Sequence, residues 1–161
     1  MPKFVLKMKA EFENVGKLMF DPANQWSLVV QNADGSETCE AYLSRDEEME
    51  LQGSKGTAHF IKKWPGENKQ SYLKIIDVKN ATVDEVTAEH SQEWVGLVCF
   101  EARGLEPVGW MTKSDFTVQS EGGTLFDPEA IEFDDGTWAD YDAENDVPVS
   151  ITELEFRFDP C

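Results

Sequence analysis

Residues 4–13 alternate between apolar and polar side chains, and this period of two constrains the fold more than any other feature. The apolar positions are Phe4, Leu6, Met8, Ala10 and Phe12. Lysine and glutamate occupy most of the positions between them. Because successive side chains of a strand point to opposite faces, the pattern predicts a long β-strand with one buried face.

Shorter segments of the same kind follow. Residues 26–43 predict a hairpin around the turn signal Asp34-Gly35, and residues 57–78 predict a second around Pro65-Gly66. Residues 94–102 are almost continuously apolar, which is typical of a central strand. The sequence therefore predicts many short strands separated by frequent turns.

Two irregularities complete the secondary-structure prediction. Residues 82–93 favour the chain's one short helix, although threonine and valine weaken it. Near the end, the apolar pattern slips by one position between Ile151 and Leu154, which predicts a β-bulge. No window shows a long helical period, so we predict an all-β fold with several sheets, arranged as a sandwich or barrel.

We expect one compact domain over residues 1–161, because that length suits a single core. A faint internal repeat pairs Phe12-Glu13-Asn14-Val15-Gly16 with Leu105-Glu106-Pro107-Val108-Gly109. It would fit two similar β halves near residues 1–90 and 91–161, and chance similarity between two strand–turn elements is the alternative.

The formal net charge of −18 argues against two classes of partner. Nucleic-acid binding depends on neutralising phosphates with Lys and Arg, and attraction to anionic membranes depends on the same residues. We therefore expect no nucleic acid and no membrane among the partners. A protein partner is the expectation that remains.

The charge is distributed unevenly. Residues 51–80 hold six lysines against two acids, whereas residues 127–146 hold nine acids and no Lys or Arg. Such asymmetry indicates a basic patch and an acidic surface, each able to steer a partner of opposite charge. Two differently solvated faces of one domain are the alternative. The candidate interaction residues are Lys62, Lys63, Lys69, Asp140 and Asp142.

No catalytic or cofactor motif is visible, and we expect a protein that is not an enzyme. Cys39, Cys99 and Cys161 are widely spaced and odd in number, which favours reduced thiols in the cytoplasm. No nucleophile motif surrounds them. The acidic stretch keeps an enzyme using carboxylates open as an alternative. Its Asp140, Asp142, Glu144 and Asp146 lack the glycine and closing glutamate of a calcium loop.

Several segments together resemble the eukaryotic CXXC-motif-containing zinc-binding protein family, an all-β family of poorly defined function. The resemblance runs over nearly the whole chain and is carried by segments in a characteristic order. They are Leu6-Lys7-Met8-Lys9-Ala10, Glu13-Asn14-Val15, Trp26, Leu51-x-Gly53-x-x-Gly56-Thr57-Ala58, Phe100-Glu101-Ala102-Arg103-Gly104-Leu105-Glu106-Pro107 and Trp138-Ala139-Asp140-Tyr141-Asp142. The Arg103–Pro107 turn either binds a ligand or pairs with nearby charges.

The resemblance implies zinc held by two C-x-x-C pairs, but this chain contains no C-x-x-C. The first pair falls on Asn32 and Gly35, and the second falls on Trp64 and Glu67. None of these residues supplies a thiolate. The resemblance therefore implies a divergent member with a degenerate zinc site and no cofactor, in which Trp64 replaces the metal cross-link by apolar packing. The alternative is a residual site made of Asp34, Cys39, His59 and Glu67.

Overall fold

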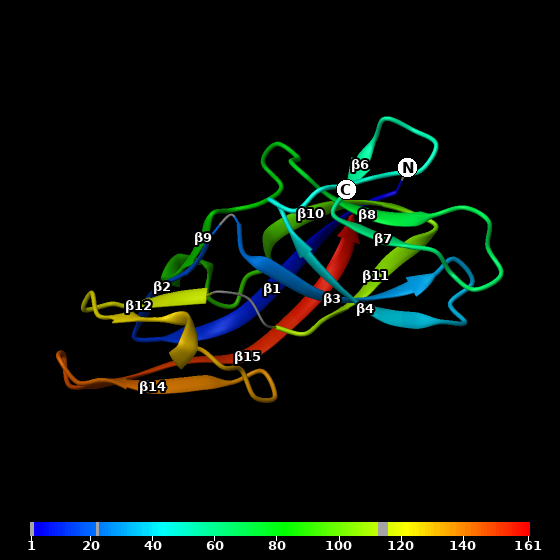
Figure 1. Ribbon diagram of the computed structural model, residues 1–161. Helices are drawn as coiled ribbons and strands as arrows, with labels where there is room; N and C mark the ends of the chain where they lie inside the picture. The colour runs from blue at the N-terminus through cyan, green and yellow to red at the C-terminus, as the bar shows by residue number, and fades with distance from the viewer. Residues whose placement is uncertain (1, 22, 113–115) are drawn as a thin grey trace.

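The protein is described by a computed structural model that covers residues 2–21, 23–112 and 116–161. Its strands form four antiparallel sheets (Figure 1). The largest has the order β14-β15-β1-β10-β8-β7. Its members are β14 (Trp138–Asp142), β15 (Val147–Pro160), β1 (Lys3–Glu13), β10 (Val95–Arg103), β8 (Ser71–Ile76) and β7 (Phe60–Lys62). The all-β fold predicted from the sequence is confirmed.

Three smaller sheets flank this one. A three-stranded sheet has the order β11-β3-β4, with β11 (Leu105–Trp110), β3 (Gln25–Asn32) and β4 (Thr38–Ser44). A four-stranded sheet joins β13 (Leu125–Phe126), β12 (Phe116–Ser120), β2 (Val15–Phe20) and β9 (Glu85–Thr87). The last pairs β5 (Met49–Glu50) with β6 (Thr57–Ala58). Two short 3-10 turns, η1 (Ala88–His90) and η2 (Pro128–Ala130), complete the elements.

The alternating segment at the start of the chain forms β1, which lies between β15 and β10. β1 and β15 run side by side diagonally through the molecule (Figure 1). Their register shifts between Lys9 and Glu11, opposite Thr152 and Glu155, so β15 carries the extra residues of a bulge. This confirms the slip that the apolar pattern predicted. Glu153 within the bulge has a positive φ of 53°.

The helix predicted for residues 82–93 is wrong. Residues 85–87 form β9, which pairs with β2 and places Val86 opposite Leu18, and only a 3-10 turn follows. Val86 and Leu18 are both buried. A β-branched side chain gains more from this cross-strand contact than a short, weak helix would offer in water.

The two candidate halves are interwoven. A residue with positive φ separates β1 from β2 (Asn14, 55°) and also β10 from β11 (Gly104, 72°). The strand that follows each of these residues pairs with a strand of the other half. β2 of the first half pairs with β12 of the second, and β11 of the second half pairs with β3 of the first. Each half therefore completes the other's sheet.

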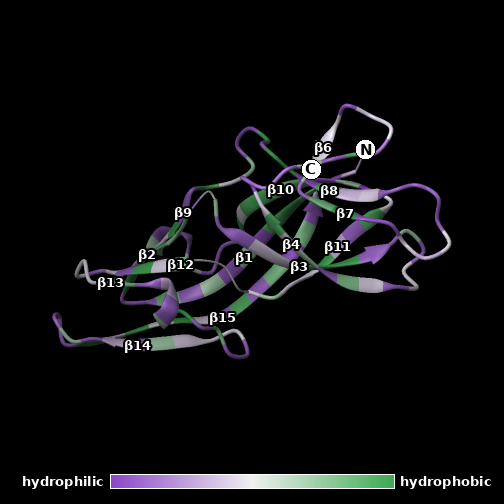
Figure 2. Cartoon of the chain, viewed as in Figure 1, coloured by the Kyte–Doolittle hydropathy of each residue, from purple (hydrophilic) through white to green (hydrophobic). Residues whose placement is uncertain are grey.

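Hydrophobic residues are concentrated on the strands, where they alternate with hydrophilic ones, whereas the loops are mostly hydrophilic (Figure 2). One core runs through the sheets, and aromatic rings fill the region where β3, β11 and β12 meet. Trp110 there contacts Trp26 and Phe116, with ring centroids 6.3 and 6.1 Å apart. No helix among the described residues is long and apolar enough to span a membrane.

Candidate functional site

The turn between β3 and β4 contains Asn32 and Gly35, and the Asn32 side chain closes it. Asn32 Oδ1 accepts a hydrogen bond from the Glu37 backbone N–H at 3.1 Å, and Nδ2 donates to Ser36 Oγ at 3.2 Å. The backbone N–H of Gly35 also bonds to the Asn32 carbonyl. Asn32 is buried, and Gly35 has a φ of 77°, which glycine adopts readily. Side-chain and backbone hydrogen bonds therefore fix this turn.

The second turn, between β7 and β8, contains Trp64 and Glu67. The Glu67 N–H bonds to the Trp64 carbonyl at 3.1 Å, and Gly66 has a φ of 82°, as position three of a type II turn requires. Trp64 is 3% exposed and belongs to the main core. Glu67 is exposed. An indole ring therefore anchors this turn to the body of the protein.

A hollow of about 290 Å³ lies between the start of β4 and the end of β7 with the residues that follow it. It is lined by Glu37, Thr38, Cys39, Lys62, Trp64 and Pro65. Burial raises the pKa of Cys39, although Lys62 opposes this shift.

The four residues of the alternative mixed-ligand site do not form a cluster. His59 is buried, and both of its ring nitrogens are engaged: Nδ1 accepts from the Ile75 N–H at 2.9 Å, and Nε2 lies 3.2 Å from the Arg45 carbonyl. Asp34 accepts a hydrogen bond from the Ser36 N–H within its own turn. In the described parts of the chain, no three His, Cys, Asp or Glu side chains are grouped to hold a metal.

Asp142 corrects one expectation about the acidic surface. It is fully buried, so its carboxylate is not available to a partner. Burial favours a higher pKa, but hydrogen bonds from Ser120, Asn145 and Thr124 outweigh it and bring the pKa of Asp142 to about 2. The Ser120 and Thr124 hydroxyls each donate at 2.7 Å. This carboxylate ties β14 to β12.

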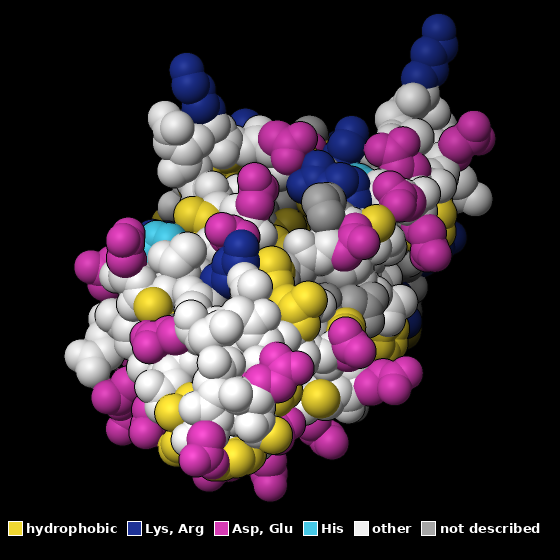
Figure 3. All heavy atoms as spheres, turned by 90° about the vertical axis from the view of Figure 1, so that its left-hand side faces the viewer, with side chains coloured by type: hydrophobic (Ala, Val, Ile, Leu, Met, Phe, Trp, Pro, Cys, Tyr) yellow, Lys and Arg dark blue, Asp and Glu magenta, His cyan; other side chains and the backbone are white. Residues whose placement is uncertain are grey.

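The remaining acidic residues are spread over the surface. Asp140 is exposed. Seen from the side of β12 and β14, Asp and Glu side chains are scattered over most of the visible face, with no single hollow where they converge (Figure 3). They form a diffuse negative surface.

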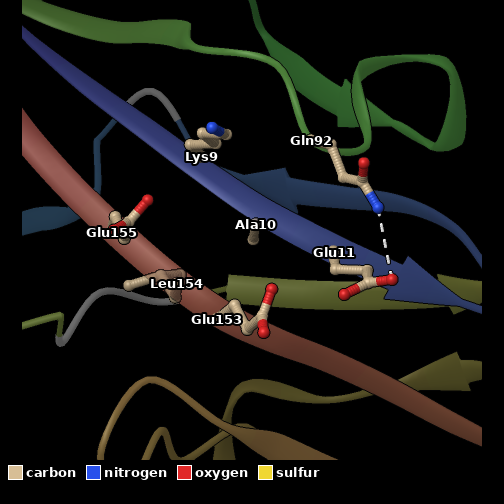
Figure 4. A pocket seen from close by; sticks show the side chains of 7 residues that line it. All are labelled: Lys9, Ala10, Glu11, Gln92, Glu153, Leu154 and Glu155. Carbon is tan, nitrogen blue, oxygen red and sulfur yellow. Dashed lines mark hydrogen bonds between the residues drawn. The ribbon is translucent and has the colours of Figure 1, made fainter.

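A larger hollow of about 610 Å³ lies at the β15 bulge (Figure 4). Glu11, Glu153 and Glu155 line it together with Lys9 and Gln92. Gln92 donates to Glu11 at 3.2 Å, as the dashed line in Figure 4 shows. The bulge places carboxylates here without a nucleophile or a His, so the hollow provides a negative depression on the surface.

Buried Cys99 is chemically quiet. Burial, with a smaller contribution from Cys161, raises its pKa to about 12. A thiol with so high a pKa is a weak nucleophile at neutral pH.

The basic residues predicted to interact surround the β7–β8 hairpin. Lys62 ends β7, Lys63 follows it, and Lys69 lies just before β8. Lys63 and Lys69 are exposed, whereas Lys62 is half-buried. The two charged side chains of the nearby Arg103–Pro107 turn have different surroundings. Glu106 accepts a hydrogen bond from Gln31. Arg103 is exposed and lies on the strand β10 where it pairs with β8.

Comparison with known proteins places these turns in a family. The family model for the eukaryotic CXXC motif containing zinc binding protein matches residues 5–159. The chain belongs to this family. This confirms the resemblance on which the zinc positions were assigned. Relatives with the family's name match the chain along its whole length.

Relatives with the name CXXC motif containing zinc binding protein include one from Xenopus laevis, 29% identical over 100% of both chains. The one from Homo sapiens is 28% identical, also over 100% of both chains. Among solved structures, a hypothetical protein from Plasmodium falciparum has a TM-score of 0.84 at 28% identity, covering 99% of this chain and 100% of its own. The crystal structure of C1orf123 has a TM-score of 0.83 at 26% identity, covering 99% of each chain.

Sequence reasoning missed two features of the site. The closing role of the Asn32 amide was not foreseen, although Asn before a turn commonly bonds to backbone two or more residues on. His59 was considered as a ligand, yet its hydrogen bonds to two backbone groups give it a structural position. The apolar neighbours Ala58 and Phe60 are the sequence signal that could have indicated this.

Proposed function

We propose that the protein is a non-catalytic interaction module that keeps the scaffold of the CXXC zinc-binding family without the zinc site. The observation that carries the proposal is the pair of turns at the family's ligand positions. Asn32 closes one by hydrogen bonds, and Trp64 anchors the other in the core. Each turn is thus held in place by its own contacts. In many small domains a shared metal ion does this instead.

The surface supports binding to another protein. The β7–β8 hairpin presents Lys62, Lys63 and Lys69, whereas the chain as a whole carries a charge of −18. An acidic partner is drawn to such a local patch, and the surrounding negative charge limits binding elsewhere. Free thiols at Cys39, Cys99 and Cys161 suit a reducing compartment, and we place the protein in the cytoplasm.

Affinity capture with a charge-reversed hairpin tests this function. Wild-type protein is expected to retain a reproducible protein partner at about 50 mM salt and to lose it at several hundred millimolar, since surface charges are screened over about 10 Å at 0.1 M. The Lys62→Glu, Lys63→Glu double variant should lose that partner. Lys79→Glu is the matched control, because Lys79 is an exposed lysine beyond β8. Capture that ignores both salt and charge reversal would contradict the proposal.

A further inference from the structure

A third hollow, of about 360 Å³, differs from the others in its charge. It is lined by Leu51, Gln52, Gly53, Ser54, Asn68, Lys69, Gln70, Tyr72 and Arg103. This lining contains two cations and no carboxylate, in a protein with 32 Asp and Glu. Four other hollows each include at least one Asp or Glu. The lining is therefore positive on an acidic molecule, and the carboxylate that acts on it is that of Glu101, beside Tyr72.

Three segments far apart in sequence build this basic hollow. The β5–β6 loop is closed by the Leu51 N–H bonding to the Gly56 carbonyl at 3.0 Å. The Gln52 N–H donates to Gln70 Oε1 at 2.8 Å, which ties that loop to the start of β8. Arg103 lies opposite Tyr72 in the β10–β8 pairing. The hollow is therefore held by the fold and does not depend on one flexible loop.

Gly104 fixes the position of Arg103. Its φ of 72° turns the chain out of β10, and an added Cβ would lie 2.3 Å from Ser71 Oγ. The Ser71 hydroxyl donates to the Gly104 carbonyl at 3.1 Å. Only glycine combines this backbone conformation with so close an approach. The β10–β11 corner is thereby locked against β8, with Arg103 at the rim of the hollow.

Lys69 and Arg103 have spare hydrogen-bonding capacity. Within residues 2–21, 23–112 and 116–161, neither makes an ion pair, whereas Lys7, Lys17, Arg45 and Arg157 do. A guanidinium offers five N–H donors in a planar fork and an ammonium offers three. The amides of Asn68 and Gln70 and the Ser54 hydroxyl add donors around the same space. Cationic and neutral donors together suit an anion with several acceptor oxygens.

We propose that this basic hollow binds a phosphate monoester, with Arg103 and Lys69 contacting its oxygens. A phosphate monoester near neutral pH carries a charge of about −1.5 to −2 and three acceptor oxygens, more than a carboxylate offers. The inference rests on the proposed interaction function and specifies its partner chemistry as a phosphorylated Ser or Thr side chain.

Amide NMR titration of the full chain tests the inference with defined probes. The probes are inorganic phosphate, N-acetyl-phosphoserine amide and, for a carboxylate, N-acetyl-glutamate amide, at constant ionic strength. Saturable shifts confined to Gly53, Gln70 and Arg103 are expected with both phosphates, and the phosphoserine compound should bind at least as tightly. The glutamate compound should bind about tenfold more weakly, because it offers fewer acceptor oxygens and less charge.

Variants locate the binding. Lys69→Gln and Arg103→Gln should each weaken the phosphoserine compound about tenfold, as expected for loss of a charge-assisted contact. Lys79→Gln should leave binding unchanged. Lys69 is exposed, so its variant remains informative if the Arg103 variant unfolds.

Absence of saturable shifts in the hollow, or equal binding by the Lys69→Gln variant, would overturn the proposal. Binding of inorganic phosphate without the phosphoserine compound would also overturn it, since the site would then take a free anion. Loss of partner capture on reversal of Lys62 and Lys63, combined with a silent hollow, would preserve the interaction function and remove only this inference.

Discussion

The ammonium of Lys62 lies over the indole ring of Trp64, with Nζ 5.6 Å from the ring centroid. Trp64 is one of the four residues that we align with the family's C-x-x-C pairs, and an aromatic ring and a positive charge stand together at its turn. A cation over the face of an indole contributes about 0.5–1 kcal/mol at an exposed site. The same positive charge disfavours a second cation nearby. Both features are expected of the metal-free turn that we propose.

The Trp64→Ala variant tests the packing role of the indole. Because Trp64 is 3% exposed, we expect the free energy of unfolding to fall by about 3–5 kcal/mol in urea denaturation. Trp94→Ala is the control, since Trp94 is half-buried and stacks with Arg157 at 4.2 Å. The control should lose less than half as much. An unchanged stability in Trp64→Ala would show that the ring is no replacement for the metal cross-link.

The Asn32→Ala variant removes the closure of the first turn. It leaves the Glu37 N–H without its side-chain acceptor, so we expect a loss of about 1–2 kcal/mol in the same assay. Asn32→Asp keeps the acceptor for the Glu37 N–H, and its carboxylate can accept from the Ser36 hydroxyl at the cost of a buried charge, so it should lose less. Equal stability of wild type and Asn32→Ala would mean that the backbone bonds alone hold the turn.

Restoring the thiolates should restore metal binding. A variant with Asn32, Gly35, Trp64 and Glu67 all changed to Cys is expected to bind about one zinc per chain. The Gly35 change places a side chain at a φ of 77° and costs about 1–2 kcal/mol. Zinc binding to four thiolates contributes about 10–16 kcal/mol, which outweighs that strain together with the loss of the Trp64 packing and the Asn32 hydrogen bonds.

Zinc content and the visible spectrum of the cobalt-substituted form measure the outcome. A matched double variant, Asn32→Cys with Gly35→Cys, supplies only two ligands and should bind at least tenfold more weakly. Failure of the four-cysteine protein to bind zinc, with its strand content retained, would show that these are not the equivalent positions.

His59 should make stability depend on pH. Burial lowers the pKa of His59 below its ordinary value of 6.5, and it does so against a hydrogen bond from the His59 ring to the Arg45 carbonyl and against the charge of Glu48. Its stabilising contribution is therefore fully present above pH 6.5 and is lost as the pH falls through the folded-state pKa, because the unfolded chain binds the proton more readily.

Denaturation at pH 7.5, 6.5 and 5.5 measures this dependence. The wild type is expected to lose stability at the acid end of the series, and His59→Gln should show a flatter profile from a lower starting value. A wild-type profile that rises on acidification would reverse the sign and contradict the burial of a neutral ring.

The sequence predicted the strands well because their signal is local. Alternation over residues 4–12 identified β1, and the slip between Ile151 and Leu154 identified the bulge in β15. The error at residues 82–93 arose because pairing of Val86 with Leu18 is a long-range contact that a local pattern does not reveal.

The site was predictable only in part. The resemblance placed the two expected pairs at turns that the structure fixes through Asn32 and Trp64, and their equivalence to the family's zinc ligands stays a prediction. It did not reveal that Asp142 is buried, since one carboxylate in an acidic run looks like its exposed neighbours. Nor did it bring Lys69 and Arg103 together, because their proximity depends on the pairing of β8 with β10.

The metal content of untagged protein, purified without chelators and measured by mass spectrometry, tests the central claim most directly. The Xenopus laevis relative, purified in the same way, serves as the reference for a protein that carries the zinc-binding name. We predict less than about 0.1 metal per chain, because structural zinc normally co-purifies at high occupancy. About one zinc per chain would contradict the account and would direct mutation to Asp34, Cys39, His59 and Glu67.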